Sequence, residues 1–319
     1  MGLTNFPKGI SSMGIPVLGT GQSDVIVGNV YWVGATAGGS WVAGVDAPEC
    51  GTKEKPFATL DYALGKCTAS NGDVIYLLPY HSETITGAGG ITIDVAGVRI
   101  IGLGRYDSRP AFLMDGATTV TCLVTAADCS IENVIFRAGH ANIVVWGTVT
   151  AKGFRLLNCH FEENTASENW LCGPSIGAAD NDADGFEMLG CTWNGATAGN
   201  SVVTINKNQN DVKIVGNVIC CDLSVTPYSA IYAPDTEVMK NILVADNIIR
   251  NDHDGNNTPT IAIANTASTG AIVRNLVGAQ DTSSETNVLA GAAGLFVAEN
   301  YCSGVLGTAS GYLYPTADS

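Results

Sequence analysis

The stretch Val212-Lys213-Ile214-Val215-Gly216-Asn217-Val218-Ile219 decides the fold of this chain. Val212 and Ile214 are apolar residues in alternate positions, and Ile219 follows Ile214 after four further residues. Alternating apolar residues predict a strand with one face turned inward. Gly or Asn next to the break tolerates the left-handed backbone that a sharp bend requires. The stretch therefore predicts a strand, a bend and a second strand.

The same template recurs beyond residue 128, at intervals of 25 to 32 residues. Five copies fit it well and two later copies fit it more weakly. The copies are Cys129/Ile131/Phe136, Phe154/Leu156/Phe161, Phe186/Met188/Trp193, Val212/Ile214/Ile219, Ile242/Val244/Ile249, Gly270/Ile272/Val277 and Leu295/Val297/Cys302. Self-similarity at such a period is the signature of a repeat architecture.

Asparagines follow the same register at the bends. From the fourth copy onward they lie three residues after the middle apolar residue, at Asn217, Asn247, Asn275 and Asn300. In the first two copies, Asn133 and Asn158 lie two residues after it. Side chains at equivalent bends of successive coils would stack, so we expect a ladder of amide hydrogen bonds.

The register makes two further predictions about packing. Cys159 and Cys191 should occupy the same bend position in adjacent coils and point toward each other. Phe136, Phe161 and Trp193 should form one buried column of aromatic side chains.

These observations predict an all-β right-handed parallel β-helix. A second apolar run lies between the copies, for example Ile143-Val144-Val145 and Ile261-Ala262-Ile263, which gives two or three strands per turn. The composition also suits strands joined by tight turns, with 46% hydrophobic and only 14% charged residues and 38 Gly. The competing β-sandwich predicts a turn every 8–12 residues and no register across the copies.

We expect four parts along the chain: an extended N-terminal arm over 1–30, a lead-in with a capping helix over 31–72, the β-helix over 73–305, and a C-terminal cap or tail over 306–319. The helix is predicted from Phe57, Leu60 and Leu64, which recur at helical spacing between Pro56 and Gly65. Such a helix would cover the open end of the stack.

Charge, apolar runs and cysteine spacing disfavour several classes of function. The net charge is −15, which disfavours nucleic-acid binding. The start has no Sec-type signal, and no apolar run is long enough to span a membrane, so we expect neither secretion by that route nor a membrane partner. The ten Cys include no CxxC pair or zinc spacing, and we expect them to be reduced and packed.

Two segments of the chain resemble known families. Lys55-Pro56-Phe57-Ala58-Thr59-Leu60-Asp61-Tyr62-Ala63, then Gly72-Asp73-Val74-Ile75-Tyr76-Leu77, resembles the helix and first strand of pectate-lyase-like β-helix proteins. Tyr31-Trp32-Val33 is similar to their lead-in. This resemblance implies the architecture over about 31–305 and no particular activity.

The opening Leu3-Thr4-Asn5-Phe6-Pro7-Lys8-Gly9-Ile10-Ser11-Ser12 resembles the start of virion proteins of tailed bacteriophages. That resemblance implies a β-helix that decorates a head or forms a tail spike. The arm would then bind the capsid through its apolar residues. We expect the contact residues to be Phe6, Ile10, Ile15, Val17 and Leu18, with Trp170 in the longest stretch between templates as a further contact residue.

Enzymes of the pectate-lyase-like class imply either a Ca²⁺-binding acidic cluster with an Arg or Lys base, or convergent carboxylates. One candidate group ends two consecutive coils and consists of Arg137, His140, His160, Glu162 and Glu163. Coils stack about 4.8 Å apart, so these side chains could approach one another. The favoured interpretation is a hydrated polar rim, and we assign no catalytic residue.

Asp180, Asp182 and Asp184, followed by Gly185, match the first half of a Ca²⁺ loop. The Glu expected at the twelfth position is missing, because residue 191 is Cys. These carboxylates are either a Ca²⁺ site or a solvated acidic turn, and no other cofactor is expected. The loop over 251–257, which contains His253, is predicted to be a polar turn.

The sequence thus favours a structural virion protein of a tailed bacteriophage: a homotrimeric decoration or cement protein made in the host cytoplasm. It would be located on the capsid surface, with the major capsid protein as its partner. The alternative is a tail-spike-like protein that binds or degrades a host surface glycan, as a hydrolase or lyase.

Overall fold

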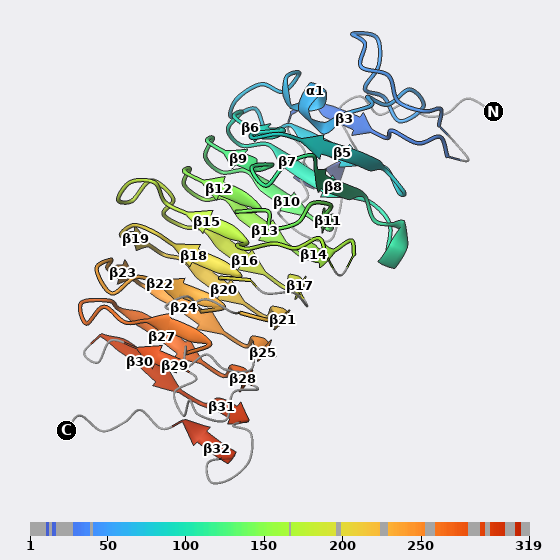
Figure 1. The fold of residues 1–319 in the computed structure, drawn as a ribbon. Coiled ribbons are helices and arrows are strands. Elements are labelled where there is room, and N and C mark those ends of the chain that lie inside the picture. The colour runs from blue at the N-terminus through green and yellow to red at the C-terminus, as the bar shows by residue number, and fades with distance from the viewer. Residues whose placement is uncertain are drawn as a thin grey trace.

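The computed structural model describes residues 28–303 apart from 39–40, 166, 196–198, 224–228, 253–258, 280–287 and 291–293. It also describes the short strands β1 (Ser11–Ser12), β2 (Ile15–Pro16) and β32 (Ser310–Leu313). The chain winds into coils that stack along one axis, from the blue N-terminal end to the red C-terminal end (Figure 1). In the described part of the chain, three long sheets run along this stack.

Sheet I consists, in order, of β3 (Val30–Val33), β4 (Val74–Leu77), β7 (Arg99–Gly102), β10 (Ser130–Glu132), β13 (Arg155–Leu157), β16 (Glu187–Leu189), β20 (Lys213–Val215), β24 (Ile242–Ala245), β27 (Gly270–Val273) and β30 (Leu295–Ala298). Sheet II consists of β5 (Ser82–Thr86), β8 (Ala111–Asp115), β11 (Ile135–Ala138), β14 (His160–Glu163), β17 (Thr192–Asn194), β21 (Val218–Cys221), β25 (Ile248–Asn251), β28 (Leu276–Ala279), β31 (Asn300–Ser303) and β32.

Sheet III consists of β6 (Ile91–Ile93), β9 (Cys122–Val124), β12 (Gly147–Val149), β15 (Pro174–Ile176), β18 (Val203–Ile205), β22 (Ile231–Ala233), β26 (Ile261–Ile263) and β29 (Val288–Ala290). A small sheet pairs β19 (Gln209–Asn210) with β23 (Met239–Lys240). Each coil passes through sheets I, II and III in turn, and neighbouring strands within each long sheet are parallel except β31 and β32. The predicted right-handed parallel β-helix is confirmed.

The predicted register also holds. The middle apolar residues of all seven templates pair in one row of sheet I: Ile131, Leu156, Met188, Ile214, Val244, Ile272 and Val297. The third apolar residues pair in one row of sheet II: Phe136, Phe161, Trp193, Ile219, Ile249, Val277 and Cys302. The two weaker copies therefore keep the same alignment as the five clear ones.

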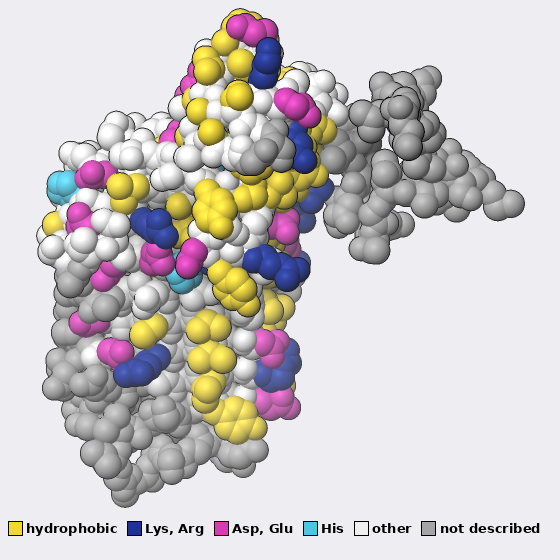
Figure 2. Space-filling view, turned by 90° about the vertical axis from the view of Figure 1, so that its right-hand side faces the viewer, with side chains coloured by type: hydrophobic (Ala, Val, Ile, Leu, Met, Phe, Trp, Pro, Cys, Tyr) yellow, Lys and Arg dark blue, Asp and Glu magenta, His cyan; other side chains and the backbone are white. Residues whose placement is uncertain are grey.

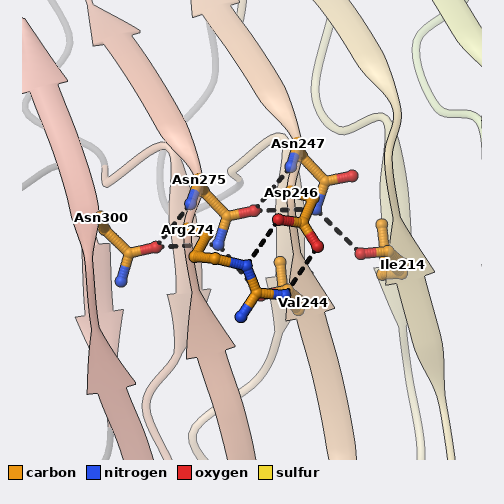
Figure 3. A network of polar contacts seen from close by, with 7 residues as sticks. All are labelled: Ile214, Val244, Asp246, Asn247, Arg274, Asn275 and Asn300. Carbon is orange, nitrogen blue, oxygen red and sulfur yellow. Dashed lines mark hydrogen bonds and ion pairs between the residues drawn. The ribbon is translucent and has the colours of Figure 1, made fainter.

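The turn from sheet I to sheet II, here called the ladder turn, contains one left-handed residue in each of these coils. The residues, with φ between 52° and 68°, are Asn133, Asn158, Gly190, Gly216, Asp246, Arg274 and Glu299. Asn, Asp and Gly reach this conformation most easily. Arg274 is a less suitable residue, and its guanidinium is held by two hydrogen bonds to Asp246 (Figure 3).

The expected asparagine ladder follows directly after the left-handed residues. Asn217, Asn247 and Asn275 each donate from Nδ2 to Oδ1 of the next asparagine at 2.9 Å, and Asn300 ends the row. Figure 3 shows the part of the ladder from Asn247 to Asn300. All four side chains are buried. Since a buried amide without partners is costly, this continuous row satisfies groups that the fold could not otherwise bury.

Aromatic rings fill the core beneath sheet II. Phe136, Phe161 and Trp193 stack with centroid separations of 5.4 and 5.3 Å, and Phe112 extends the column at 5.8 Å. Trp146 packs edge-on against Phe136 and Phe161. The predicted buried column is confirmed, and it extends one coil further than the template.

The N-terminal end of the stack is covered by helix α1 (Leu60–Leu64), whose Leu60, Ala63 and Leu64 are buried. Thr59 caps the helix by accepting a hydrogen bond from the Tyr62 amide. The expected arm contacts Phe6, Ile10, Val17 and Leu18 lie outside the described residues, and Ile15 is described only as backbone in β2.

The nine cysteines whose side chains the structure describes, all except Cys302, are free thiols. Over the described part of the chain, the helices lack the length and apolar character that a membrane-spanning helix needs.

Candidate functional site

The outer face of sheet II carries a row of exposed apolar side chains beside the ladder turn. In four consecutive coils, the outward residue next to this turn is Val218, Ile248, Leu276 or Tyr301, and these four pair in register. Their side chains are 46–49% exposed. Figure 2 shows hydrophobic side chains in a column on this face. We call these four residues the apolar stripe.

The fold does not require apolar residues at these positions. The inward neighbours Ile219, Ile249 and Val277 are buried and fill the core. The stripe residues point the other way, where a β-strand can carry any polar residue. One coil earlier the same row holds Thr192, so a polar residue is compatible with the position. Contiguous apolar patches on protein surfaces are typical of binding sites, so the stripe is the candidate functional surface of the described residues.

One ion pair lies on each side of the stripe, and within each pair the positive and negative charges balance. At the ladder turn, Arg274 donates from Nε and Nη2 to the two carboxylate oxygens of Asp246, both at 2.7 Å. These hydrogen bonds lower the pKa of Asp246, so the carboxylate stays ionised. On the other side, Arg250 pairs with Asp252. The stripe therefore has locally balanced charge in a chain whose net charge is −15.

A polar cluster lies on the same face, closer to the N-terminal end. Glu162 accepts a hydrogen bond from Arg137 Nε at 2.5 Å, and its other oxygen lies 2.9 Å from His160 Nε2. The hydrogen bond to His160 is the main cause that lowers the pKa of Glu162 to about 2, and Arg137 adds to it against the opposing effect of burial. A general acid needs a raised pKa, so Glu162 is suited to an ion pair and not to proton donation.

The other two members of the predicted polar group make different contacts. His140 uses Nδ1 for a contact with the carbonyl of Ala141 at 2.8 Å. Glu163 follows Glu162 in β14 and is engaged in an interaction of its own. The cluster around Glu162 is thus an inter-coil contact on a polar part of the surface.

The contact role expected for Trp170 is wrong for this fold. Its side chain is only 2% exposed, and its ring lies 6.3 Å from that of Trp193. Its Nε1 donates to the carbonyl of Glu162 at 3.2 Å. The loop after β14 turns back onto the core, so Trp170 packs there and does not reach the surface.

The predicted metal ligands Asp180, Asp182 and Asp184 are not brought together as one site. Asp182 accepts hydrogen bonds from the amides of Ala178 and Ala179 at 3.0 and 2.8 Å. Asp184 accepts from the Asn210 amide at 2.8 Å and faces Lys152 at 3.2 Å. Among the described residues, no group of three or more His, Cys, Asp or Glu side chains could hold a metal ion. Asp182 and Asp184 instead cap backbone amides or pair with a side chain.

Next to this acidic turn lies a groove with a volume of about 380 Å³. It runs across the loops that precede sheet I in four coils. The lining residues are Asp180, Asn181, Asn208, Asn210, Val238, Lys240 and Ala267. The His253 loop, which the sequence predicts to be a polar turn, lies outside the described residues.

The apolar stripe was not among the features predicted from the sequence. Its signal is the residue directly after the ladder asparagine, which is apolar in Asn217-Val218, Asn247-Ile248 and Asn275-Leu276, and Tyr301 after Asn300. In each strand the following residue, such as Ile219 after Val218, is apolar as well. Only one of two successive strand residues can point into the core, so the other must lie on the outer face.

No family model matches this chain, and no curated protein matches it. Three solved structures are similar in fold. A rhamnogalacturonan lyase is 13% identical with a TM-score of 0.43, covering 79% of this chain and 74% of its own. Pectate lyase Pel9A is 14% identical with a TM-score of 0.47, covering 87% and 79%. A GH136 lacto-N-biosidase from Eubacterium ramulus is 10% identical with a TM-score of 0.37, covering 86% and 67%. At these values the likeness concerns the course of the backbone and carries no argument about activity.

Proposed function

We propose that this chain is a structural protein that assembles into a homotrimer through the apolar stripe, in the role of a decoration or cement protein on the head of a tailed bacteriophage. The observation that carries the proposal is the row of Val218, Ile248, Leu276 and Tyr301, half-exposed at equivalent positions of four coils. The bacteriophage setting is supported only by the N-terminal sequence resemblance.

The stripe favours a second copy of the same chain as its partner. Around a rotation axis parallel to the solenoid, equivalent residues of each copy come close to one another. Apolar residues gain from such contacts, whereas a row of like charges would repel. The neighbouring pairs Arg274–Asp246 and Arg250–Asp252 are neutral within one subunit, so they do not oppose this approach.

The position of the stripe favours three copies over two. It lies next to the ladder turn, where sheets I and II meet at a corner of the coil. On the sheet I side of this corner, Phe296 is 66% exposed. A corner with apolar residues on both sides fits between two neighbours around a threefold axis. A flat interface between two copies would use one side alone.

The test is the mass of the assembly in solution. We expect the wild type to sediment at about three times 33.0 kDa, and the double variant Ile248→Asp/Leu276→Asp to sediment as a monomer with unchanged β-sheet circular dichroism. Val144→Asp is a matched control, because Val144 is 51% exposed but lies outside the stripe. A wild type that is monomeric at micromolar concentration contradicts the proposal.

Glycan binding is a second candidate, favoured by the groove beside the acidic turn. Amide and carboxylate side chains with Lys240 at one side are groups that bind sugar hydroxyls. Binding of the wild type to a glycan array, lost in Lys240→Ala and kept in the stripe variant, would support this function. Cleavage of a bacterial polysaccharide by the intact protein would replace the structural role with an enzymatic one.

A further inference from the structure

Two tyrosines near the N-terminal end of the β-helix have a strained backbone and exposed side chains. Tyr80 has φ 60° and Tyr106 has φ 50°. Most of the other non-glycine residues with left-handed backbone among the described residues are Asn or Asp, which tolerate it. The side chains of Tyr80 and Tyr106 are 66% and 84% exposed. Burial within the subunit therefore does not compensate for the strain.

The two tyrosines belong to loops that hold each other in place. Tyr106 lies in the short 3-10 helix η2 (Tyr106–Ser108), and Tyr80 donates its amide hydrogen to the carbonyl of Ser108 at 2.9 Å. The Ser108 hydroxyl is 2.8 Å from the Arg105 amide. At the base of the loop, Asn133 donates from Nδ2 to the carbonyl of Gly102 at 2.7 Å. The folded frame thus fixes where both tyrosines point, and strained residues held in this way are typical of functional positions.

The same loop adds positive charge to an acidic protein. Arg105 and Arg109 flank η2, and no ion pair joins either guanidinium to a carboxylate in the described part of the chain. Tyrosine and arginine side chains are the residues that contribute most to protein interfaces. We call Tyr80, Arg105, Tyr106 and Arg109 the tyrosine knob.

The tyrosine knob lies along the same edge of the solenoid as the apolar stripe. Tyr80 connects β4 to β5, and Tyr106 connects β7 to β8, so both lie at the turn from sheet I to sheet II. The stripe begins just after this turn in later coils. Figure 2 shows further hydrophobic and basic side chains above the apolar column on the same face.

We infer that the tyrosine knob is the second part of the subunit interface and docks on the acidic surface of a neighbouring copy of this chain. The inference rests on the proposed self-association. Each copy also carries the exposed Asp107 in η2, between the two arginines of the knob. When equivalent loops meet around the axis, this carboxylate of one copy can face a guanidinium group of the next, in a chain that carries 30 Asp and Glu against 15 Lys and Arg. The shared edge places the knob next to the partner that the stripe already holds.

Glycine substitutions separate an interface role from a folding role. Tyr80→Gly/Tyr106→Gly removes both side chains and also relieves the left-handed strain. Fold stability is measured in the monomeric Ile248→Asp/Leu276→Asp background, where we expect the double glycine variant to unfold at the same temperature or a higher one. Association is measured in the otherwise wild-type chain, where we expect the trimer to dissociate at a concentration about tenfold higher or more. Asn142→Gly is the matched control, because Asn142 also has a left-handed backbone, with φ 54°.

Charge reversal tests the predicted acidic partner. Arg105→Glu/Arg109→Glu should weaken the trimer at least as much as the glycine variants, whereas the exposed control Arg155→Glu should not. If both knob variants assemble like the wild type while the stripe variant is monomeric, the knob inference is overturned and the proposed function stands. If, in that case, the knob variants also lose retention on heparin, the knob is assigned to an acidic glycan and the subunit-interface inference is still overturned. If the wild type does not self-associate, both proposals fail.

Discussion

Cys191 donates its backbone amide hydrogen to Oδ1 of Asn217 at 2.8 Å, so the asparagine ladder ends on a cysteine. The Cys191 thiol lies 3.5 Å from the carbonyl of Leu156, in the place where Asn217 Nδ2 reaches the carbonyl of Met188 at 3.0 Å. Cys159 continues the row with its thiol 3.5 Å from the carbonyl of Ile131. The predicted stacking of Cys159 and Cys191 in adjacent coils is therefore confirmed, and the thiols are a weaker continuation of the amide row.

Removal of one ladder amide should destabilise the fold strongly. Asn247 accepts hydrogen bonds from the amide and side chain of Asn217 and donates to Ile214 and Asn275. Asn247→Ala would leave several buried groups without partners, at a cost of about 3 kcal/mol or more. Urea unfolding followed by circular dichroism measures the loss. The exposed Asn194→Ala is the control, and an equal, small effect of both changes would show that the ladder does not stabilise the fold.

Phe161→Ala should lower the free energy of unfolding by about 3–5 kcal/mol. The ring of Phe161 is fully buried between Phe136 and Trp193, and Trp146 closes the site from the side. The cavity cannot collapse easily, because these neighbours are fixed by their own strands. Phe161→Leu should cost clearly less. Similar losses for the two substitutions would argue against a tightly packed column.

Stability should fall in acid partly through Glu162. Its folded pKa of about 2 is below the ordinary value of 4.5, mainly because of the hydrogen bond to His160 and the pairing with Arg137. A lowered folded pKa contributes stability that is complete above about pH 5 and is lost as the pH falls from there toward 2. In Glu162→Gln, the unfolding midpoint should therefore depend less on pH between 5 and 2. Parallel curves for wild type and variant would contradict this account.

The fold could be predicted because it depends on residues that repeat in register. Apolar inward residues recur in the seven template coils at the positions of Ile214 and Ile219. One spacing therefore fixes the register of sheets I and II together. Asn217 marks the bend because a buried amide at that position requires a partner in the next coil. Both signals are local in sequence and repeat along the chain.

The candidate site could not be predicted in the same way. The template assigns Ile219 to the core and leaves Val218 outward, but single apolar residues are common on protein surfaces, so Val218 alone does not indicate a binding surface. Tyr106 gives no signal of its left-handed backbone, because the frame that imposes it comes from distant residues. Asp182 resembles a metal ligand in sequence, but backbone amides of its own turn occupy one of its oxygen atoms.

The arm provides the last prediction, which rests on the proposed head-decorating role. Deletion of residues 1–20 removes Phe6, Ile10, Ile15, Val17 and Leu18. Each apolar side chain buried on a capsid could contribute about 1.5–3 kcal/mol, while ordering the backbone costs about 1–2 kcal/mol per residue. One arm therefore binds weakly, and three linked arms bind tightly through effective concentration.

The truncated protein should keep its β-sheet circular dichroism and its trimer mass but fail to co-sediment with heads assembled without it. The intact protein and the arm-containing stripe variant serve as comparisons, since the monomeric variant should attach much more weakly than the trimer. Full decoration by the truncated trimer would show that the arm is not the attachment element. Equal attachment by the monomer and the trimer would show that linkage of three arms is not needed.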